Sequence, residues 1–115
     1  MTELTFRDIE KSALRIRNYI TKTPVITNET LNQKLGGQVF FKCENLQKTF
    51  SFKARGAFNA VLAYHEKNGR LPKKIVTASS GNHAQALAYV GKLLGIPVLV
   101  YMAKNTPSLK VSMTR

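Results

Sequence analysis

The pattern of apolar and polar positions in the first part of the chain predicts two helices and two short strands. From residue 6 to residue 20, apolar side chains return at steps of three and four, which is the period of an amphipathic helix. Helical spacing resumes near residue 29 and stops at Gly36-Gly37, since glycine readily takes the left-handed conformation that closes a helix. Residues 25–26 and 38–43 are apolar stretches that we expect to form strands.

Polar residues mark the expected starts of two helices. Thr5, with Asp8 three residues later, resembles a capping box in which aspartate replaces the usual glutamate. After a loop over residues 44–50, Ser51 is expected to cap a helix that runs to about residue 67.

The second half of the chain alternates between strand and helix. Residues 74–78 and 97–102 are expected strands, and a helix from residue 82 to residue 94, closed by Gly95, joins them. When a helix connects two neighbouring strands of a sheet, the strands run parallel. The pattern therefore predicts a βαβ unit.

The last part of the chain is expected to contain one strand and one helix. The apolar run Val98-Leu99-Val100 predicts a strand that is buried on both faces. Thr106-Pro107 is expected to open a last helix that reaches Arg115, and no turn residue follows it. We therefore predict an α/β protein with a parallel sheet flanked by helices. We expect a truncated piece of a larger enzyme rather than a self-contained small domain.

Composition and charge exclude some classes of protein. A length of 115 residues with 43% hydrophobic residues suits one modest globular domain. The net charge of +12 raises the question of a nucleic-acid partner, but the basic residues are spread along the chain, so none is expected. No apolar run approaches the roughly 18 residues of a membrane helix. Cys43 is the single cysteine, which excludes a disulfide framework, and we expect a cytoplasmic protein.

Two blocks of sequence carry candidate chemistry. The first, Ser51-Phe52-Lys53-Ala54-Arg55-Gly56-Ala57, places a lysine at the expected start of a helix. A lysine amine attacks an aldehyde in its neutral form, which apolar surroundings favour. The second, Ser79-Ser80-Gly81-Asn82-His83, lies where an expected strand meets a helix. The first amides of a helix bind anions, and Gly81 lets the backbone approach a ligand closely.

In this order, the two blocks resemble the N-terminal part of the fold-type II pyridoxal-phosphate (PLP) dependent serine/threonine dehydratase and serine racemase family. The resemblance implies a partial tryptophan synthase β-like fold. Residues 1–73 would form the N-terminal part of a large PLP-binding domain, and residues 74–115 the start of a small βαβ domain. One position departs from the family, which usually has glycine immediately before the serine of the first block, where this chain has Phe50.

The resemblance also implies a site. Lys53 would bond covalently to PLP and take the Cα proton of the substrate, and Phe52 would pack against the pyridine ring. Asn82 would donate a hydrogen bond to the phenolic oxygen of the cofactor. The substrate carboxylate would be bound by Ser79, Ser80, Gly81, Asn82 and His83. A purely structural role for His83 stays open, and no metal site is expected in this chain.

The implied reaction is β-elimination of a small hydroxy amino acid (serine, threonine or 3-hydroxyaspartate) to a 2-oxo acid and ammonia, or racemisation of serine. Racemisation needs a second base opposite Lys53, and the hydroxyl of Ser80 is the candidate. The family's glycine-rich loop for the PLP phosphate is absent, so we expect the 115-residue chain alone to be inactive. A non-catalytic fragment that acts as an interaction module and a basic nucleic-acid-binding domain are the alternatives, and a homo-oligomer is left open.

Overall fold

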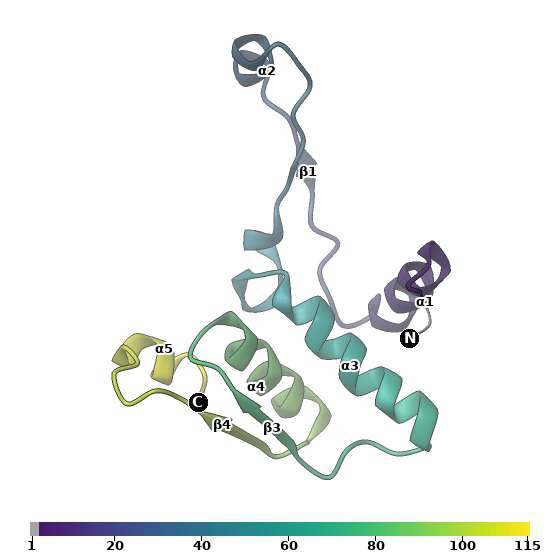
Figure 1. Ribbon diagram of the computed structural model, residues 1–115, viewed down its shortest axis with the longest axis vertical. Helices are drawn as coiled ribbons and strands as arrows, with labels where there is room; N and C mark the ends of the chain where they lie inside the picture. The colour runs from purple at the N-terminus through teal and green to yellow at the C-terminus, as the bar shows by residue number, and fades with distance from the viewer. Residues whose placement is uncertain (1–2) are drawn as a thin grey trace.

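The structure is a computed structural model that describes residues 3–115 (Figure 1). Helices and strands alternate along the chain, as the sequence predicts. They are α1 Phe6–Ile16, β1 Val25–Ile26, α2 Glu29–Leu35, β2 Phe41–Lys42, α3 Lys53–Asn68, β3 Ile75–Ala78, α4 Asn82–Leu94, β4 Val98–Tyr101 and α5 Ser108–Ser112. Two short 3-10 helices, η1 Glu44–Leu46 and η2 Lys48–Phe50, occupy the segment predicted as a loop.

The parallel βαβ unit is confirmed. Strands β3 and β4 pair in parallel from Ile75 opposite Val98 to Ala78 opposite Tyr101, and α4 connects them. Helix α4 has the predicted bounds and ends at Gly95, whose φ of 69° is the left-handed conformation that glycine takes freely. Burial of β4 on both faces was a wrong prediction. Its first three residues are only partly buried, because within residues 3–115 this strand pairs with β3 alone.

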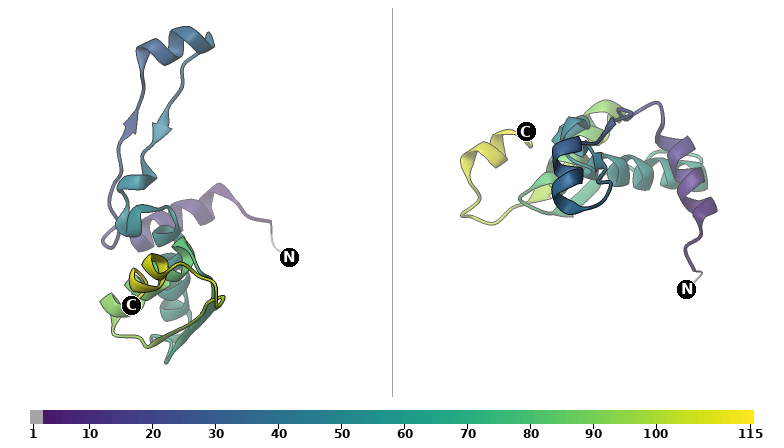
Figure 2. Two further views of the ribbon diagram at one scale, coloured as in Figure 1. Left: turned by 90° about the vertical axis from the view of Figure 1, so that its left-hand side faces the viewer. Right: turned by 90° about the horizontal axis from the view of Figure 1, so that it is seen from above.

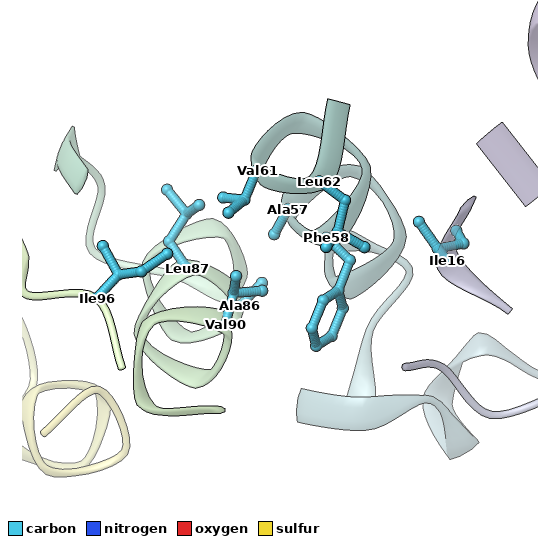
Figure 3. Close-up of a cluster of buried hydrophobic side chains, with 9 residues drawn as sticks. All are labelled: Ile16, Ala57, Phe58, Val61, Leu62, Ala86, Leu87, Val90 and Ile96. Atoms are coloured by element: carbon cyan, nitrogen blue, oxygen red, sulfur yellow. The ribbon is translucent and has the colours of Figure 1, made fainter. Parts of the chain in front are cut away.

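The hydrophobic core lies between α3 and α4 (Figure 3). Phe58 is at its centre with a fully buried ring, stacked on Tyr19 at a centroid distance of 5.2 Å and edge-on to Tyr89 at 6.0 Å. The cluster of buried apolar residues comprises Ile16, Ala57, Phe58, Val61, Leu62, Ala86, Leu87, Val90 and Ile96. The core thus includes residues from both sides of residue 73, and the division into two domains stays a prediction.

Residues 25–42, which we call the arm, project away from this core (Figures 1 and 2). The arm consists of β1, α2 and β2, and its two strands pair antiparallel, with Val25 opposite Lys42 and Ile26 opposite Phe41. The radius of gyration is 17.0 Å, whereas a compact domain of this length has about 13 Å. The second predicted strand, over residues 38–43, is shorter than expected because only two of its residues find partners across the arm.

Two predicted helix ends needed correction, the end of α1 and the start of α3. Helix α1 begins with the predicted capping box but stops at Ile16, because the chain then turns to bring Tyr19 onto Phe58. The hydroxyl of Ser51 makes no capping bond, since Ser51 is extended and the residue before α3 is Phe52.

Helix α5 also differs from the prediction at both ends. It covers Ser108–Ser112, and Pro107 precedes it instead of forming its first residue. The hydroxyl of Thr106 donates to the carbonyl of Ala103, 2.6 Å away, so it is not available as a cap. Among residues 3–115, no helix combines the length and apolarity that crossing a membrane requires.

Candidate functional site

Lys53 is the first residue of α3 and is exposed. Its Nζ lies 5.0 Å from the ring centroid of Phe52, a distance at which a cation is attracted to an aromatic face. Phe52 is itself exposed. The apolar surroundings that we expected for this lysine are therefore not supplied by the described residues, and its amine is open to a ligand.

The turn before Lys53 has an unusual backbone. Thr49 and Phe50 have φ of 57° and 56°, which is the left-handed region that residues with a Cβ rarely adopt. Each such residue costs on the order of 1–2 kcal/mol relative to a right-handed conformation. The position where the family usually has glycine is thus one where glycine would relieve a real conformational cost.

Two hydroxyls in the same turn are buried without a hydrogen-bond partner. They are Thr49 Oγ1 and Ser51 Oγ, and they are the two such side-chain atoms found in residues 3–115. An unsatisfied buried hydroxyl costs roughly 1–3 kcal/mol, so native proteins keep few of them. The turn that presents Lys53 therefore combines an unfavourable backbone with unused polar groups, a combination that is concentrated at functional sites.

The second block joins β3 to α4, as predicted. The amide of Ser79 donates to the carbonyl of Tyr101 over 3.1 Å and extends the β3–β4 ladder by one residue. The amide of Gly81 donates to Ser79 Oγ over 3.3 Å. Asn82 and His83 are exposed in the first turn of α4, and Ser79, Ser80 and Gly81 are partly buried.

The start of α4 is suited to an anion. The residue before the helix is Gly81, so no side chain caps the first amides. Within residues 3–115, and apart from Gly81 and its two neighbours in the chain, no atom lies within 4 Å of the point where a Cβ on Gly81 would be, so the backbone there is open. Unpaired amides and the positive end of the helix dipole together attract a carboxylate or a phosphate.

The fold brings the two blocks to the same end of one helix pair. Helices α3 and α4 are packed against each other, and both begin at the end where β3 stops (Figure 1). Within residues 3–115, no hydrogen bond joins Lys53 to Ser79–His83. The structure thus places both blocks at one end of the helix pair, and in the described residues no hydrogen bond links Lys53 to the second block.

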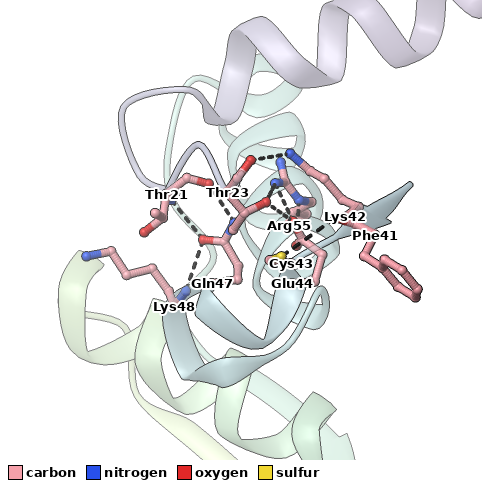
Figure 4. A network of polar contacts seen from close by, with 9 residues as sticks. All are labelled: Thr21, Thr23, Phe41, Lys42, Cys43, Glu44, Gln47, Lys48 and Arg55. Atoms are coloured by element: carbon pink, nitrogen blue, oxygen red, sulfur yellow. Dashed lines mark hydrogen bonds and ion pairs between the residues drawn. The ribbon is translucent and has the colours of Figure 1, made fainter. Parts of the chain in front are cut away.

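Sequence reasoning missed a polar network at the base of the arm (Figure 4). Arg55, in the first turn of α3, donates from Nε to Glu44 Oε2 over 2.8 Å and from Nη2 to Oε1 over 2.7 Å. The hydroxyl of Thr23 also donates to this carboxylate. The pKa of Glu44 is lowered to about 2. The hydrogen bonds from Arg55 are the largest cause, and the hydrogen bond from Thr23 lowers the pKa further.

A second part of this network fixes the segment before β1. The side chain of Gln47 is almost fully buried, accepts from the amide of Thr21 over 2.8 Å and donates to its carbonyl over 2.7 Å. The network therefore ties the chain before β1 and the chain after β2 to the helix that begins with Lys53. The local sequence pattern does not mark Glu44 and Arg55 as partners, because the fold brings together two positions that belong to different elements.

The residues present fit a PLP site. An exposed lysine amine is the group that bonds to the cofactor aldehyde, and an uncapped helix start with serine and asparagine side chains suits an anionic, oxygen-rich ligand. Residues 3–115 contain no cluster of three or more histidine, cysteine or acidic side chains that could hold a metal ion.

Comparison with known proteins identifies the family. A family model described as "Pyridoxal-phosphate dependent enzyme" matches residues 16–115. The serine racemase of Dictyostelium discoideum is 47% identical over 112 residues, which are 97% of this chain and 34% of the racemase. The L-threo-3-hydroxyaspartate ammonia-lyase of Saccharomyces cerevisiae is 44% identical over 110 residues, covering 96% of this chain and 33% of the lyase.

Solved structures agree with the sequences. The crystal structure of a pyridoxal 5'-phosphate-dependent aspartate racemase matches with a TM-score of 0.89 and 45% identity, over 99% of this chain and 36% of the racemase. The structural neighbours are fold-type II PLP enzymes, which confirms the predicted fold class. The chain spans about a third of the length of these relatives. Given a family match over residues 16–115 and nearly half identity across the chain, the protein belongs to the pyridoxal-phosphate dependent enzyme family.

Proposed function

We propose that this chain is the lysine-bearing part of a PLP-dependent enzyme that acts on a small hydroxy amino acid. The observation that carries the proposal is the placement of an exposed lysine and an uncapped helix start at one end of the α3–α4 pair (Figure 1). Relatives named serine racemase and hydroxyaspartate ammonia-lyase support the substrate class. We also keep the division at residue 73 into parts of two domains as a proposal.

Each site residue has a role in this proposal. The amine of Lys53 holds the cofactor and takes the proton from the substrate Cα, and Phe52 and Asn82 bind the cofactor. When bound, PLP supplies an electron sink for the charge left on Cα. The substrate carboxylate is bound at the start of α4, by the residues Ser79, Ser80, Gly81, Asn82 and His83.

The choice of reaction depends on Ser80. Elimination needs one base, which Lys53 provides, whereas racemisation needs a second proton donor on the other side of Cα. The partly buried Ser80, one residue before the helix cap, is our candidate for that donor. A Ser80→Ala substitution in the active enzyme is expected to abolish formation of the D-amino acid while 2-oxo acid formation continues.

The first test of the proposal is covalent trapping on the 115-residue chain. The chain is mixed with PLP and reduced with borohydride, and the pyridoxyl group is located by peptide mass. We expect the label on Lys53, because its amine is exposed at the same end of the α3–α4 pair as the uncapped start of α4. Lys53→Ala should lose the label, and Lys67→Ala, at the other end of the same helix, should keep it. Label spread evenly over the lysines would contradict the proposal.

A further inference from the structure

A small cavity lies between α1, the segment that follows it and the base of the arm. Its volume is about 260 Å³. It is lined by Ala13, Arg17, Ile20, Lys22, Lys42 and Arg55. Four of these side chains are cations, and they come from α1's C-terminal end, the following linker, β2 and α3. None of them belongs to the residues proposed above to bind cofactor or substrate.

The charges around this cavity are poorly balanced. Both Lys42 and Arg55 contact Thr23 (Figure 4). Lys42 Nζ donates to the carbonyl of Thr23 over 2.8 Å, and Arg55 Nη2 lies 3.5 Å from the Thr23 hydroxyl. Within residues 3–115, Glu44 is the one carboxylate in an ion pair with either of them, and both of its oxygens accept hydrogen bonds from Arg55.

The other two cations increase this imbalance. Arg17 and Lys22 are exposed and make no ion pair within residues 3–115. Like charges near a protein surface repel by a few kcal/mol at close range. The low pKa of Glu44, which Arg55 chiefly sets and Lys42 also lowers, is consistent with a positive potential at this point.

We propose that this cavity is a binding site for an oxyanion, and that the group it recognises is a phosphate. A phosphate brings two or more negative charges and several acceptor oxygens, which match convergent lysine and arginine donors. The guanidinium of Arg17 makes no ion pair in the part of the chain that the structure describes, while Arg55 is a fixed charge held by Glu44. The volume lies below the roughly 300–1,000 Å³ of pockets for drug-sized ligands, so a single phosphate group suits it better than a whole nucleotide.

The site would also link parts of the molecule that are distant in sequence. A bound phosphate contacts the end of α1, the linker, the arm and the first turns of α3 together. Binding to the folded state alone raises the free energy of unfolding. The inference stands independently of the proposed enzyme function, because it needs neither Lys53 nor the start of α4.

A phosphate titration of the 115-residue chain, at constant ionic strength and without PLP, tests this inference through amide chemical shifts. We expect saturable shifts confined to residues 17–23, Lys42 and Arg55. The double variant Arg17→Gln/Lys22→Gln should bind at least tenfold more weakly. The control Arg7→Gln/Lys11→Gln removes the same charge from exposed positions of α1 that do not line the cavity, and should bind as the parent does.

Circular dichroism of both double variants shows whether their folds are retained. Shifts that rise linearly, spread over the whole chain or persist equally in both double variants would overturn the site. Tripolyphosphate and adenosine triphosphate distinguish the source of the phosphate. Equal affinity points to free phosphates, and tighter binding of the nucleotide points to a nucleotide whose phosphate enters the cavity.

Discussion

At the scale of single residues, Thr49 and Phe50 stand out, because within residues 3–115 they are the non-glycine residues with positive φ. Both residues are left-handed, and Phe50 is 74% exposed, so its ring gains little burial in return. The cost falls three and four residues before Lys53, the first residue of α3.

Phe50→Gly is expected to stabilise the chain. Glycine removes a left-handed penalty of about 1–2 kcal/mol but makes the unfolded chain more flexible by about 0.4–1 kcal/mol, so the net gain should be on the order of 0.5–1 kcal/mol. The free energy of unfolding from urea denaturation measures it. Phe50→Ala keeps the Cβ and serves as the control, and a gain of the same size there would refute the backbone explanation.

Glu44 provides a second prediction at this scale, which concerns pH. Its pKa is lowered from 4.5 to about 2 by Arg55, and its side chain is only 18% exposed. A carboxylate with a lowered pKa stabilises the folded state above its unfolded pKa, and the contribution disappears as the pH falls through the folded pKa. The contribution is therefore complete above pH 4.5 and is lost towards pH 2, and it amounts to about 3 kcal/mol at most.

Glu44→Gln should accordingly lower the free energy of unfolding at pH 7 by about 2–3 kcal/mol. The difference from the parent chain should shrink as the pH is taken from 4.5 towards 2. Denaturation curves at several pH values measure both effects. Glu10→Gln, an exposed change on α1, controls for loss of a charge alone, and a pH-independent deficit in Glu44→Gln would contradict the ion-pair explanation.

At the scale of elements, the close contact between α4 and β4 depends on a glycine. A Cβ on Gly91 would be 2.1 Å from Val98 Cγ2 and 2.7 Å from the carbonyl oxygen of Ile96. The carbonyl belongs to backbone and cannot rotate away, so the helix would have to move off the strand.

Gly91→Ala should therefore destabilise the chain, by about 1–3 kcal/mol as overpacked cores do. Gly56, inside α3, is the matched control, because beyond the nearby backbone of its own helix no atom of residues 3–115 lies within 4 Å of its Cβ position. Gly56→Ala should stabilise by roughly 0.5–1 kcal/mol, because alanine favours helix. Thermal and urea denaturation of the two variants compare them, and equal effects would refute the contact.

The sequence predicts an element well when the residues that start and end it lie within or beside that element. Helix α4 was predicted to the residue, since Gly81 and Gly95 flank it and act through their own backbone. The end of α1 was missed because Tyr19 leaves the helix to reach Phe58, a contact between distant positions. The pair of Glu44 and Arg55 was invisible for the same reason.

The candidate site shows the same division. The motifs around Lys53 and Ser79–His83 identified the family. Their position at one end of the α3–α4 pair was not predicted, because α3 lies outside the βαβ unit and its packing on α4 is a contact between distant positions. The left-handed turn at Thr49 and its unpaired hydroxyl had no sequence signal, apart from the departure at Phe50. The roles of the site residues stay predictions until they are measured.

At the scale of the whole molecule, the arm and the core behave as two parts joined at one place. The core is held by apolar contacts around Phe58, whereas the arm is joined to it by the polar contacts of Glu44, Arg55 and Gln47. The ion pair of Glu44 and Arg55 weakens as the pH falls and as salt is added. The apolar contacts of the core respond far less to either change. The two parts are thus held by forces that respond to different conditions.

The two-stranded sheet has a consequence for the behaviour of the chain in solution. With β3 and β4 paired only to each other within residues 3–115, each strand leaves one backbone edge unpaired, and such edges invite the strands of other molecules. The net charge of +12 keeps copies apart over the Debye length, about 8 Å at physiological salt. Colloidal stability of this chain therefore rests on its excess of lysine and arginine, and added salt brings the sheet edges within reach of one another.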